Sequence, residues 1–351
     1  MDIERKKTRE VFCGNVKIGG DAPISIQSMT NTDTRDVKRT VDQIKSLEKA
    51  GCEIIRVAVL DLEAAQALKE IKQNINIPIV ADIHFDYRLA LEAIKHGVDK
   101  LRLNPGNIGD VDRVKKVVMK AKERNIPIRI GVNAGSIDKK IINKYGKVTP
   151  EAMVESALEH VEILQNLNFE DIVISLKASD IKLTIESYRL MAKKVDYPLH
   201  IGVTEAGTIK GGTIKSCIGI GAMLLDGIGD TLRVSLTGDP VEEVKLAREI
   251  LKAVELRNFG INLISCPTCG RTQIDLISLA NRIEPKLTTI DKPLTVAIMG
   301  CAVNGPGEAK DADIGIAGGK GSALLFKKGE IIKKVKEEDI EAVLLEEIMK
   351  M

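Results

Sequence analysis

The sequence contains no tryptophan, and only five phenylalanines and four tyrosines occur among its 351 residues. That is too few aromatic side chains for the base-stacking surfaces that hold single-stranded nucleic acid. Charge of one sign is also lacking, because 52 Lys and Arg residues stand against 50 Asp and Glu residues. Without a net positive field, we expect no nucleic-acid partner.

Long apolar runs are absent as well. No stretch of about 18 apolar residues occurs, so we expect no membrane-spanning helix and no membrane partner. The first ten residues, MDIERKKTRE, are polar and lack the apolar region of a signal peptide. The sequence therefore predicts a cytoplasmic protein.

Short β-branched apolar runs alternate with amphipathic helical patterns through the first 240 residues. Strands are predicted at 24–30, 52–59, 77–84, 98–105, 126–133, 171–179, 198–205 and 231–237. Near-continuous apolar strands are typical of a parallel sheet that helices cover. Eight strand–helix units of this size favour an α/β fold of the TIM (β/α)8 barrel type. A doubly wound open sheet is the alternative, but no G-x-G-x-x-G follows any predicted strand.

The pattern changes after a helix predicted at 240–257. A short link at 258–265, a strand at 294–300, a β-hairpin at 323–335 and a terminal helix at 337–350 indicate a small α+β domain. We therefore predict a barrel domain over residues 1–257 and an α+β domain over residues 258–351. The extra segment 134–148, after the fifth strand, is either a lid on the catalytic face or a surface insertion.

Three of the six cysteines lie in the predicted second domain. Cys266 and Cys269 form a C-x-x-C, and Cys301 follows later in a glycine-rich segment that ends at Glu308. A thioredoxin-like pair and a zinc site are alternatives, but all four histidines lie in the barrel. Three thiolates beside glycines favour an iron–sulfur cluster. Glu308 is then either the fourth ligand or an exposed turn residue.

The other three cysteines, Cys13, Cys52 and Cys217, are isolated among apolar residues. We predict that all three are buried thiols, since free cysteine behaves as a small hydrophobic residue.

Polar and charged residues mark the carboxyl ends of the predicted strands, where barrel enzymes place their active sites. They are Arg56, Asp82, His84, Arg102, Asn104, Arg129, Asn133, Lys177, Thr204, Glu205, Arg233 and Ser235. Four guanidinium groups and one ammonium group suit the oxygens of a phosphate or diphosphate ligand. Internal salt bridges to Asp82 and Glu205 are the alternative, but two acids leave a surplus of cations.

Other candidates at the barrel are weaker. The amides near Gly211 and Gly212 lie where a helix is predicted to begin, and could hold another phosphate. We interpret His200 as structural because it lies near the start of its strand. His84, at a strand end, fits either a structural or a binding role.

The motifs SMTNTDT, ADIHFDY, LRLNPGNIG, IRIGVN, SLKAS, GVTEAG, GIGDTLRVSLT, SCPTCGR and MGCAVNGPGEA occur in this order along the chain. With them the sequence resembles the bacterial 4-hydroxy-3-methylbut-2-en-1-yl diphosphate synthase family of the methylerythritol phosphate route to isoprenoids, in its short two-domain form. The resemblance implies a two-electron reductive ring opening of 2-C-methyl-D-erythritol 2,4-cyclodiphosphate to 4-hydroxy-3-methylbut-2-enyl diphosphate, with loss of water.

The same resemblance implies roles for individual residues. A 4Fe-4S cluster would be held by Cys266, Cys269, Cys301 and Glu308. The diphosphate contacts fall on Arg56, Arg102, Arg129, Asn133, Lys177, Arg233 and Ser235. Beside them we count His84 as a candidate from its position at a strand end. Glu205 would be the acidic catalytic residue near the substrate.

No flavin or nicotinamide fingerprint occurs, so we expect an external electron donor, a flavodoxin or a ferredoxin. The alternatives are another iron–sulfur dehydratase or reductase acting on a phosphorylated small molecule, and a non-catalytic redox sensor.

We also predict a homodimer with shared active sites. The helix at 240–257 would run about 27 Å away from the catalytic face. The link at 258–265 can extend at most about 28 Å to bring the cysteines back. Reaching a partner's barrel is easier, and the resemblance also implies a dimer.

Overall fold

The computed structural model describes residues 3–290, 292–302 and 309–351. The chain divides into two compact units, Met1–Arg257 and Asn258–Met351. None of the helices in the described part of the chain has the length and apolar character needed to cross a membrane.

The first unit is built on eight parallel strands, which confirms the predicted barrel. They are β3 (Ser25–Met29), β4 (Ile54–Ala58), β5 (Ile79–Asp82), β6 (Lys100–Arg102), β7 (Ile128–Asn133), β8 (Ile172–Lys177), β9 (His200–Ile201) and β10 (Thr231–Leu232). Their order is β8-β7-β6-β5-β4-β3-β10-β9. A parallel bridge between Ile174 and Leu199 joins β8 to β9, so the two ends of this order meet.

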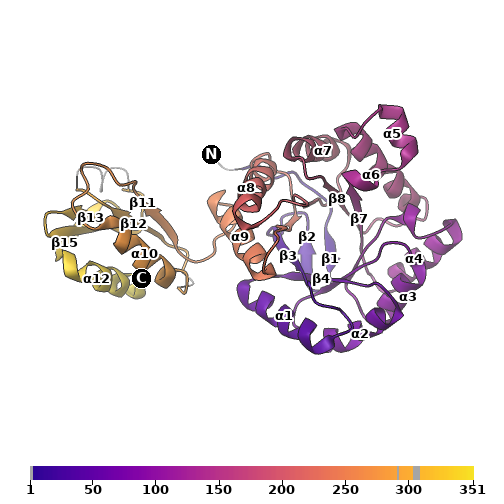
Figure 1. The fold of residues 1–351 in the computed structure, drawn as a ribbon, viewed down its shortest axis with the longest axis horizontal. Coiled ribbons are helices and arrows are strands. Elements are labelled where there is room, and N and C mark those ends of the chain that lie inside the picture. The colour runs from indigo at the N-terminus through magenta and orange to yellow at the C-terminus, as the bar shows by residue number, and fades with distance from the viewer. Residues whose placement is uncertain (1–2, 291, 303–308) are drawn as a thin grey trace. The chain divides into compact units, whose positions relative to one another are not determined.

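Helices surround these strands (Figure 1). They are α1 (Val37–Ala50), α2 (Leu62–Gln73), α3 (Tyr87–Lys95), α4 (Val111–Glu123), α5 (Lys139–Tyr145), α6 (Pro150–Gln165), α7 (Ile181–Lys194), α8 (Ile209–Leu225) and α9 (Pro240–Ala253). An aspartate precedes most of them and accepts a hydrogen bond from the first turn, as Asp61 does from the Ala64 N–H at 2.8 Å. Apolar stripes such as Val41, Ile44 and Leu47 of α1 face the strands.

Side chains alternate along each strand between the helix layer and the barrel interior. On β7, Ile128 and Ile130 lie on one side, while Arg129 and Gly131 lie on the other. All four are buried. This is why the strands read as nearly continuous buried runs although the barrel interior is polar.

A small antiparallel hairpin precedes the barrel and was not predicted. It consists of β1 (Val11–Cys13) and β2 (Val16–Ile18), with Gly14 at φ +57° in the turn. Cys13 and Ile18 pack against Ile54 and Val80, the first or second residues of their strands. The hairpin therefore covers the amino-terminal end of the barrel.

Several boundaries differ from prediction. Strands β9 and β10 have only two residues each, and α9 ends at Ala253, four residues before the predicted end. The segment 134–148 contains the short helix α5. The predicted link at 258–265 is half strand, because β11 (Asn262–Ser265) pairs with the next strand.

One cysteine prediction is wrong. Cys13 and Cys52 are buried, but Cys217 is exposed on α8. That helix carries apolar residues on all sides, including Ile214 and Ile218, which are also exposed. The apolar neighbours of Cys217 in the sequence therefore do not indicate that its side chain is buried.

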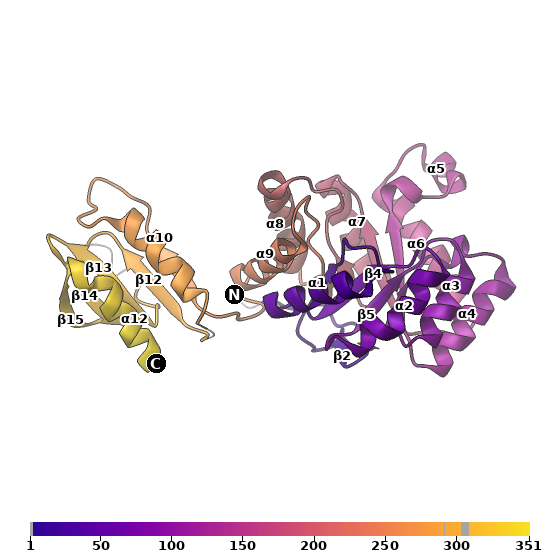
Figure 2. The same cartoon turned by 60° about the horizontal axis from the view of Figure 1, so that its bottom comes forward.

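The second unit is a five-stranded sheet in the order β11-β12-β13-β14-β15. Beyond β11 its strands are β12 (Thr295–Met299), β13 (Ile314–Gly319), β14 (Ser322–Lys327) and β15 (Glu330–Lys336). The predicted hairpin is confirmed as β14 and β15, and the terminal helix as α12 (Ile340–Lys350). Helices α10 (Leu276–Leu287) and α12 pack on one sheet face with Val296, Ile298 and Leu325 (Figure 2). The other face carries a small cluster around Phe326.

Candidate active site

The predicted cations of the barrel occupy inward-facing positions. Arg102 and Lys177 end their strands and Arg233 directly follows β10, whereas Arg56 lies in the middle of β4 and Arg129 is the second residue of β7. We call Arg56, Arg102, Arg129, Lys177 and Arg233 the inner cations. Register places them together: Arg102 pairs with Arg129 across β6 and β7, and Asp82 pairs with Arg102 across β5 and β6. Five cations of one barrel interior thus converge, as the sequence predicted.

Arg56 and Arg233 meet at a thioether. The Arg56 Nε and Nη2 atoms lie 3.1 and 2.8 Å from the Met29 sulfur, and Arg233 Nη1 lies 3.6 Å from it. A thioether is a weak acceptor, so neither guanidinium is neutralised there. Burial lowers the pKa of Arg56 to about 10, and the charges of Arg233 and Arg102 add to the shift against Asp82.

Arg129 and Lys177 are both buried members of the group. Arg129 is 1% exposed, and it donates one hydrogen bond from Nη1 to Ser175 Oγ at 2.8 Å. Its Nε and Nη2 atoms have no partner among the described residues. Burial lowers the pKa of both Arg129 and Lys177, and the neighbouring arginines lower them further. An anion between these groups would relieve both effects.

Two carboxylates offset part of this charge. Asp82 lies 3.2 Å from Arg102 Nη1 and 3.7 Å from Arg56 Nε. Burial alone would raise the pKa of Asp82, but Arg56, a hydrogen bond from His84 and Arg102 hold it well below its ordinary value. The second carboxylate, Glu243 of α9, lies 3.4 Å from Arg233 Nη2.

Glu205 is not part of this ion-pair network. It is exposed after β9, and its φ of +52° lies in the left-handed region that non-glycine residues rarely adopt. The internal salt-bridge alternative therefore holds for Asp82 but not for Glu205. With Glu243 added, five inner cations face two acids among the described residues, which leaves the surplus that an anionic ligand requires.

The remaining candidates lie at or just beyond the ends of the same strands. Asn104 bonds both backbone groups of Gly131, with its Oδ1 accepting from the N–H at 2.9 Å and its Nδ2 donating to the carbonyl at 3.0 Å. His84 is exposed, with Nε2 3.2 Å from Arg102 Nη1. Asn133 and Ser235 are half-buried at or just beyond strand ends.

Sequence reasoning missed three buried or half-buried residues of the barrel interior: Met29 and Glu243 at this site, and Lys100 below it. Lys100 lies two residues before Arg102 on β6 and shares its inward face, so strand alternation could have identified it. Glu243 resembles an ordinary acid in the first turns of a helix. Nothing in the local sequence shows that its side chain is buried against a strand end.

The cysteines of the second unit follow neighbouring strands. Cys266 comes directly after β11, and Cys301 lies two residues after the end of β12. The Gly300 N–H lies 3.1 Å from the Cys266 sulfur. Amide hydrogen bonds to sulfur of this kind are typical of iron–sulfur sites.

Cys269 is exposed, and hydrogen bonds from the backbone and side chain of Arg271 lower its pKa. That favours the thiolate, which is the form that binds metal. Across residues 3–290, 292–302 and 309–351, no three His, Cys, Asp or Glu side chains are grouped closely enough to hold a metal ion. Glu308, the predicted fourth ligand, lies outside the described residues. The three cysteines fit the donor chemistry of a cluster without being drawn together around one point.

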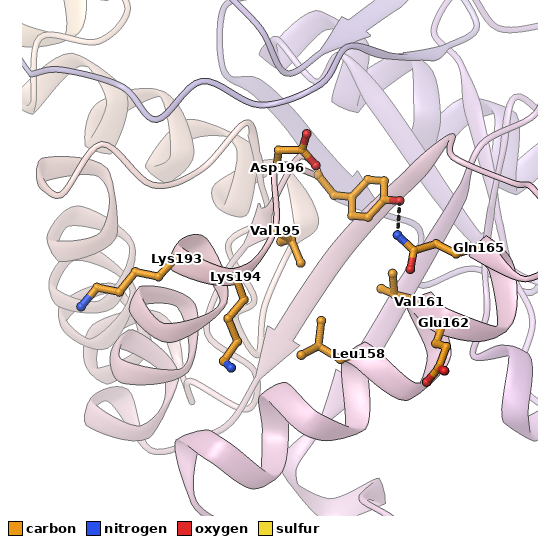
Figure 3. A pocket seen from close by; sticks show the side chains of 9 residues that line it. Leu158, Val161, Glu162, Gln165, Lys193, Lys194, Val195 and Asp196 are labelled. Atoms are coloured by element: carbon orange, nitrogen blue, oxygen red, sulfur yellow. Dashed lines mark hydrogen bonds between the residues drawn. The ribbon is translucent and has the colours of Figure 1, made fainter.

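A groove of about 650 Å³ elsewhere on the barrel contains none of these residues (Figure 3). Leu158, Val161, Glu162 and Gln165 of α6 line one side, and Lys193 to Tyr197 line the other. Gln165 donates a hydrogen bond to the Tyr197 hydroxyl at 3.0 Å, drawn as a dashed line in Figure 3. The groove lies at the carboxyl ends of helices, so it is separate from the candidate active site.

The chain is similar over nearly its whole length to curated proteins. Two curated relatives, from Ruminiclostridium cellulolyticum and Caldanaerobacter subterraneus subsp. tengcongensis, are 63% and 65% identical to the chain. Each match covers 99% of this chain, and 99% and 98% of the relatives, respectively. Both relatives are named 4-hydroxy-3-methylbut-2-en-1-yl diphosphate synthase (flavodoxin).

A dihydropteroate synthase structure from Stenotrophomonas maltophilia resembles the barrel, with a TM-score of 0.50 and 12% identity. The match covers 71% of this chain and 98% of that one, and at this identity it supports the fold alone. The GcpE TIM-barrel domain matches residues 8–248, and the GcpE protein C-terminal domain matches residues 262–350. The chain belongs to the GcpE family.

Proposed function

We propose that the chain catalyses the reductive ring opening of 2-C-methyl-D-erythritol 2,4-cyclodiphosphate to 4-hydroxy-3-methylbut-2-enyl diphosphate, with loss of water. The observation that carries this proposal is the surplus of inner cations in the barrel of a GcpE family member. Its relatives bear the name of the enzyme that makes this product.

Substrate binding falls to the inner cations. Arg129 and Lys177 are buried and lack a carboxylate partner among the described residues, so we assign them to the diphosphate. Asp82 orients Arg102 and Arg56, since it lies within 3.7 Å of each. Asn133, Ser235 and His84 are assigned to the rim of the same site, and Glu205 is proposed to supply a proton to an oxygen of the substrate.

Electron transfer is assigned to the second unit. Cys266, Cys269 and Cys301, with Glu308 as the fourth ligand, would hold a 4Fe-4S cluster. When bound, such a cluster supplies single electrons at low potential and an iron that accepts oxygen ligands. The relatives' names specify flavodoxin, and we propose a flavodoxin as the external donor, with a ferredoxin as the alternative.

We further propose a cytoplasmic homodimer with shared active sites. All six cysteines are free, which suits a reducing compartment. Large apolar side chains are exposed where the second and third barrel strands lead into their helices: Leu60 and Phe85 are both 76% exposed. Exposed apolar side chains just beyond the carboxyl ends of barrel strands suit a surface that another domain covers.

Anaerobic reconstitution tests the function directly. The chain should take up about four irons, and it should convert the cyclodiphosphate only when reduced flavodoxin is present. Stoichiometric zinc without cluster absorbance would contradict the cluster assignment. Turnover without reductant would favour a dehydratase, which consumes no electrons.

The Arg129→Ala variant distinguishes the proposed enzyme from the alternative of a non-catalytic redox sensor. As part of a diphosphate clamp, Arg129 should be required for turnover, with the cluster retained in the variant. If the chain is instead a sensor whose cluster only reports redox state, the unsubstituted chain has no turnover. The substitution then changes no measurable activity.

A further inference from the structure

Below the inner cations lies a second set of inward-facing polar groups that the proposed function does not use. We call Ser25, Gln27, Lys100, His200 and Thr231 the inner polar layer. All five are buried, and Lys100, His200 and Thr231 are 0% exposed. The Lys100 Nζ, His200 Nδ1, Ser25 Oγ, Thr231 Oγ1 and both amide atoms of Gln27 have no hydrogen-bond partner among the described residues.

Strand register places three of these side chains side by side, whereas Gln27 lies two residues beyond Ser25 on β3 and Lys100 lies across the barrel on β6. Thr231 pairs with Ser25 on one side and with His200 on the other. Each of the five shares the inward face of its strand, as Lys100 does with Arg102 two residues on. Val80, which pairs with Lys100, packs against Cys13 and Ile18 of the hairpin, so the hairpin lies under this layer.

The inner polar layer is rich in hydrogen-bond donors. His200 Nε2 lies 3.5 Å from Lys177 Nζ, and a lysine ammonium can only donate. Nε2 is then the acceptor, and the ring proton resides on Nδ1, which faces the layer as a donor. With the Lys100 ammonium, the Gln27 amide and two hydroxyls, five buried donors without a partner among the described residues face the barrel interior.

The charge in this region is positive and poorly offset. Asp82 and Glu243 already contact the inner cations, and neither forms an ion pair with Lys100. Burial lowers the pKa of Lys100 to about 8, and Cys13 and Asp99 oppose that shift while Arg129 and Arg56 reinforce it. Lys100 lies two residues below Arg102, or about 6.6 Å deeper, so a diphosphate at the strand ends leaves it unpaired.

We propose that the inner polar layer binds one small inorganic anion of the halide class, held by the Lys100 ammonium and the donors of His200, Gln27, Ser25 and Thr231. Buried polar groups in native proteins are satisfied, and donors around a cation are satisfied together by an anion. The anion is distinct from the substrate diphosphate and has a structural role. It offsets a buried charge and fixes the ring of His200, whose other nitrogen contacts Lys177.

Bromide is the probe, because it can replace chloride and scatters anomalously. Crystals of the full chain soaked in bromide should show one anomalous peak within 3.5 Å of Lys100 Nζ, separate from any peak among the inner cations. Ordered waters alone at this position would overturn the proposal. So would a neutral, unliganded Lys100.

The melting temperature in solution provides a second test. The melting temperature of the full chain should be several degrees higher in chloride or bromide than in gluconate at equal ionic strength. The Lys100→Met variant should lose this halide dependence, whereas Lys95→Met, on the outer surface of α3, should keep it. Equal melting temperatures in halide and gluconate for the unsubstituted chain would contradict the proposal. Because the diffraction arm uses the unsubstituted chain, it decides the matter even if Lys100→Met does not fold.

Discussion

At the scale of the residue, Glu243 connects the helix layer to the candidate active site. Its Oε1 accepts from the Leu236 N–H at 2.9 Å, and its Oε2 lies 3.4 Å from both Arg233 Nη2 and Ser28 Oγ. The Glu243→Gln substitution keeps the size of the side chain but removes the charge beside a cation-rich interior. We expect a loss of about 1–3 kcal/mol in the free energy of unfolding, measured with denaturant.

Glu242→Gln is the matched control, since it lies one residue away on α9 and pairs with Lys245 at 2.7 Å near solvent. Such a pair contributes about 0–1 kcal/mol. Equal losses for the two variants would show that Glu243 has no special role.

His200 should make stability depend on pH. Burial lowers its pKa well below the ordinary value, and the charges of Arg129, Lys177 and Lys100 lower it further. The folded chain therefore keeps His200 neutral, while the unfolded chain binds a proton below about pH 6.5. Because the unfolded state binds more protons, stability falls as pH drops below that value.

The His200→Gln variant should lack this contribution. From about pH 7 to about pH 5.5, the unfolding free energy of the unsubstituted chain should fall about 1 kcal/mol more than that of the variant. Denaturant titrations at the two pH values measure the difference. An identical pH dependence in both chains would mean that His200 binds protons equally in the folded and unfolded states.

The residue scale also shows what sequence could and could not reveal. The inner cations were predictable, because charged residues inside apolar strands stand out and strand ends define the active face of a barrel. Glu243 was not, because its contact with Arg233, just beyond β10, depends on how α9 packs against β3. Strand alternation alone predicts that Lys100 faces the interior, because it lies two residues before Arg102 on β6. It attracts less notice than the residues at the strand ends.

At the scale of the element, β7 makes room for the site through a glycine. A Cβ atom at Gly131 would lie 2.7 Å from Arg102 Nε, and Arg102 Nη2 donates to the Gly131 carbonyl at 3.1 Å. Because the obstructing atoms belong to the end of a flexible side chain, Gly131→Ala should displace Arg102 rather than the strand. We expect affinity for the cyclodiphosphate to fall about tenfold, which is about 1.4 kcal/mol.

Calorimetric titration of the cluster-free chain measures this affinity without requiring turnover. Gly135→Ala is the control, since no atom lies within 4 Å of a Cβ at that position. Its affinity should match that of the unsubstituted chain. If Gly131→Ala binds equally well, the exact placement of Arg102 does not matter for binding.

Elements were predictable where periodicity was long and regular. The eight barrel strands and the hairpin of β14 and β15 follow from apolar runs bounded by turn residues. Strands β1 and β2 have three residues each, too short for such a signal. Helix α8 is apolar on every side, so its sequence does not show which face is buried, and the placement of Cys217 failed for that reason.

At the scale of the whole molecule, the two units have separate cores. The main core of the second unit draws only on residues from Ile261 to Ile348, and the barrel encloses its own interior. The division was predictable because the strand–helix alternation stops near residue 257. Substrate binding and electron transfer are thus assigned to different units, and the proposed catalysis requires that they cooperate.

Mixing two inactive variants tests whether the barrel unit of one chain works with the second unit of another chain. Arg129→Ala disables the barrel site, and Cys301→Ser disables the cluster site. In a mixed dimer with shared sites, one site combines an intact barrel with an intact second unit. After subunit exchange at equal amounts, half of the dimers are mixed, so activity should return to about a quarter of the unsubstituted value.

The chain carrying both substitutions serves as the control, mixed in equal amount with the unsubstituted chain. With shared sites, every site of a mixed dimer contains one disabled half, so only the unsubstituted homodimers work. Activity per total chain should then be about a quarter of the unsubstituted value, whereas chains that each complete their own site would keep about half. Recovery in the first mixture and the lower value in the second would together establish the shared site. With exchange verified by mass spectrometry, no recovery in the first mixture and half activity in the second would show that each chain closes on itself.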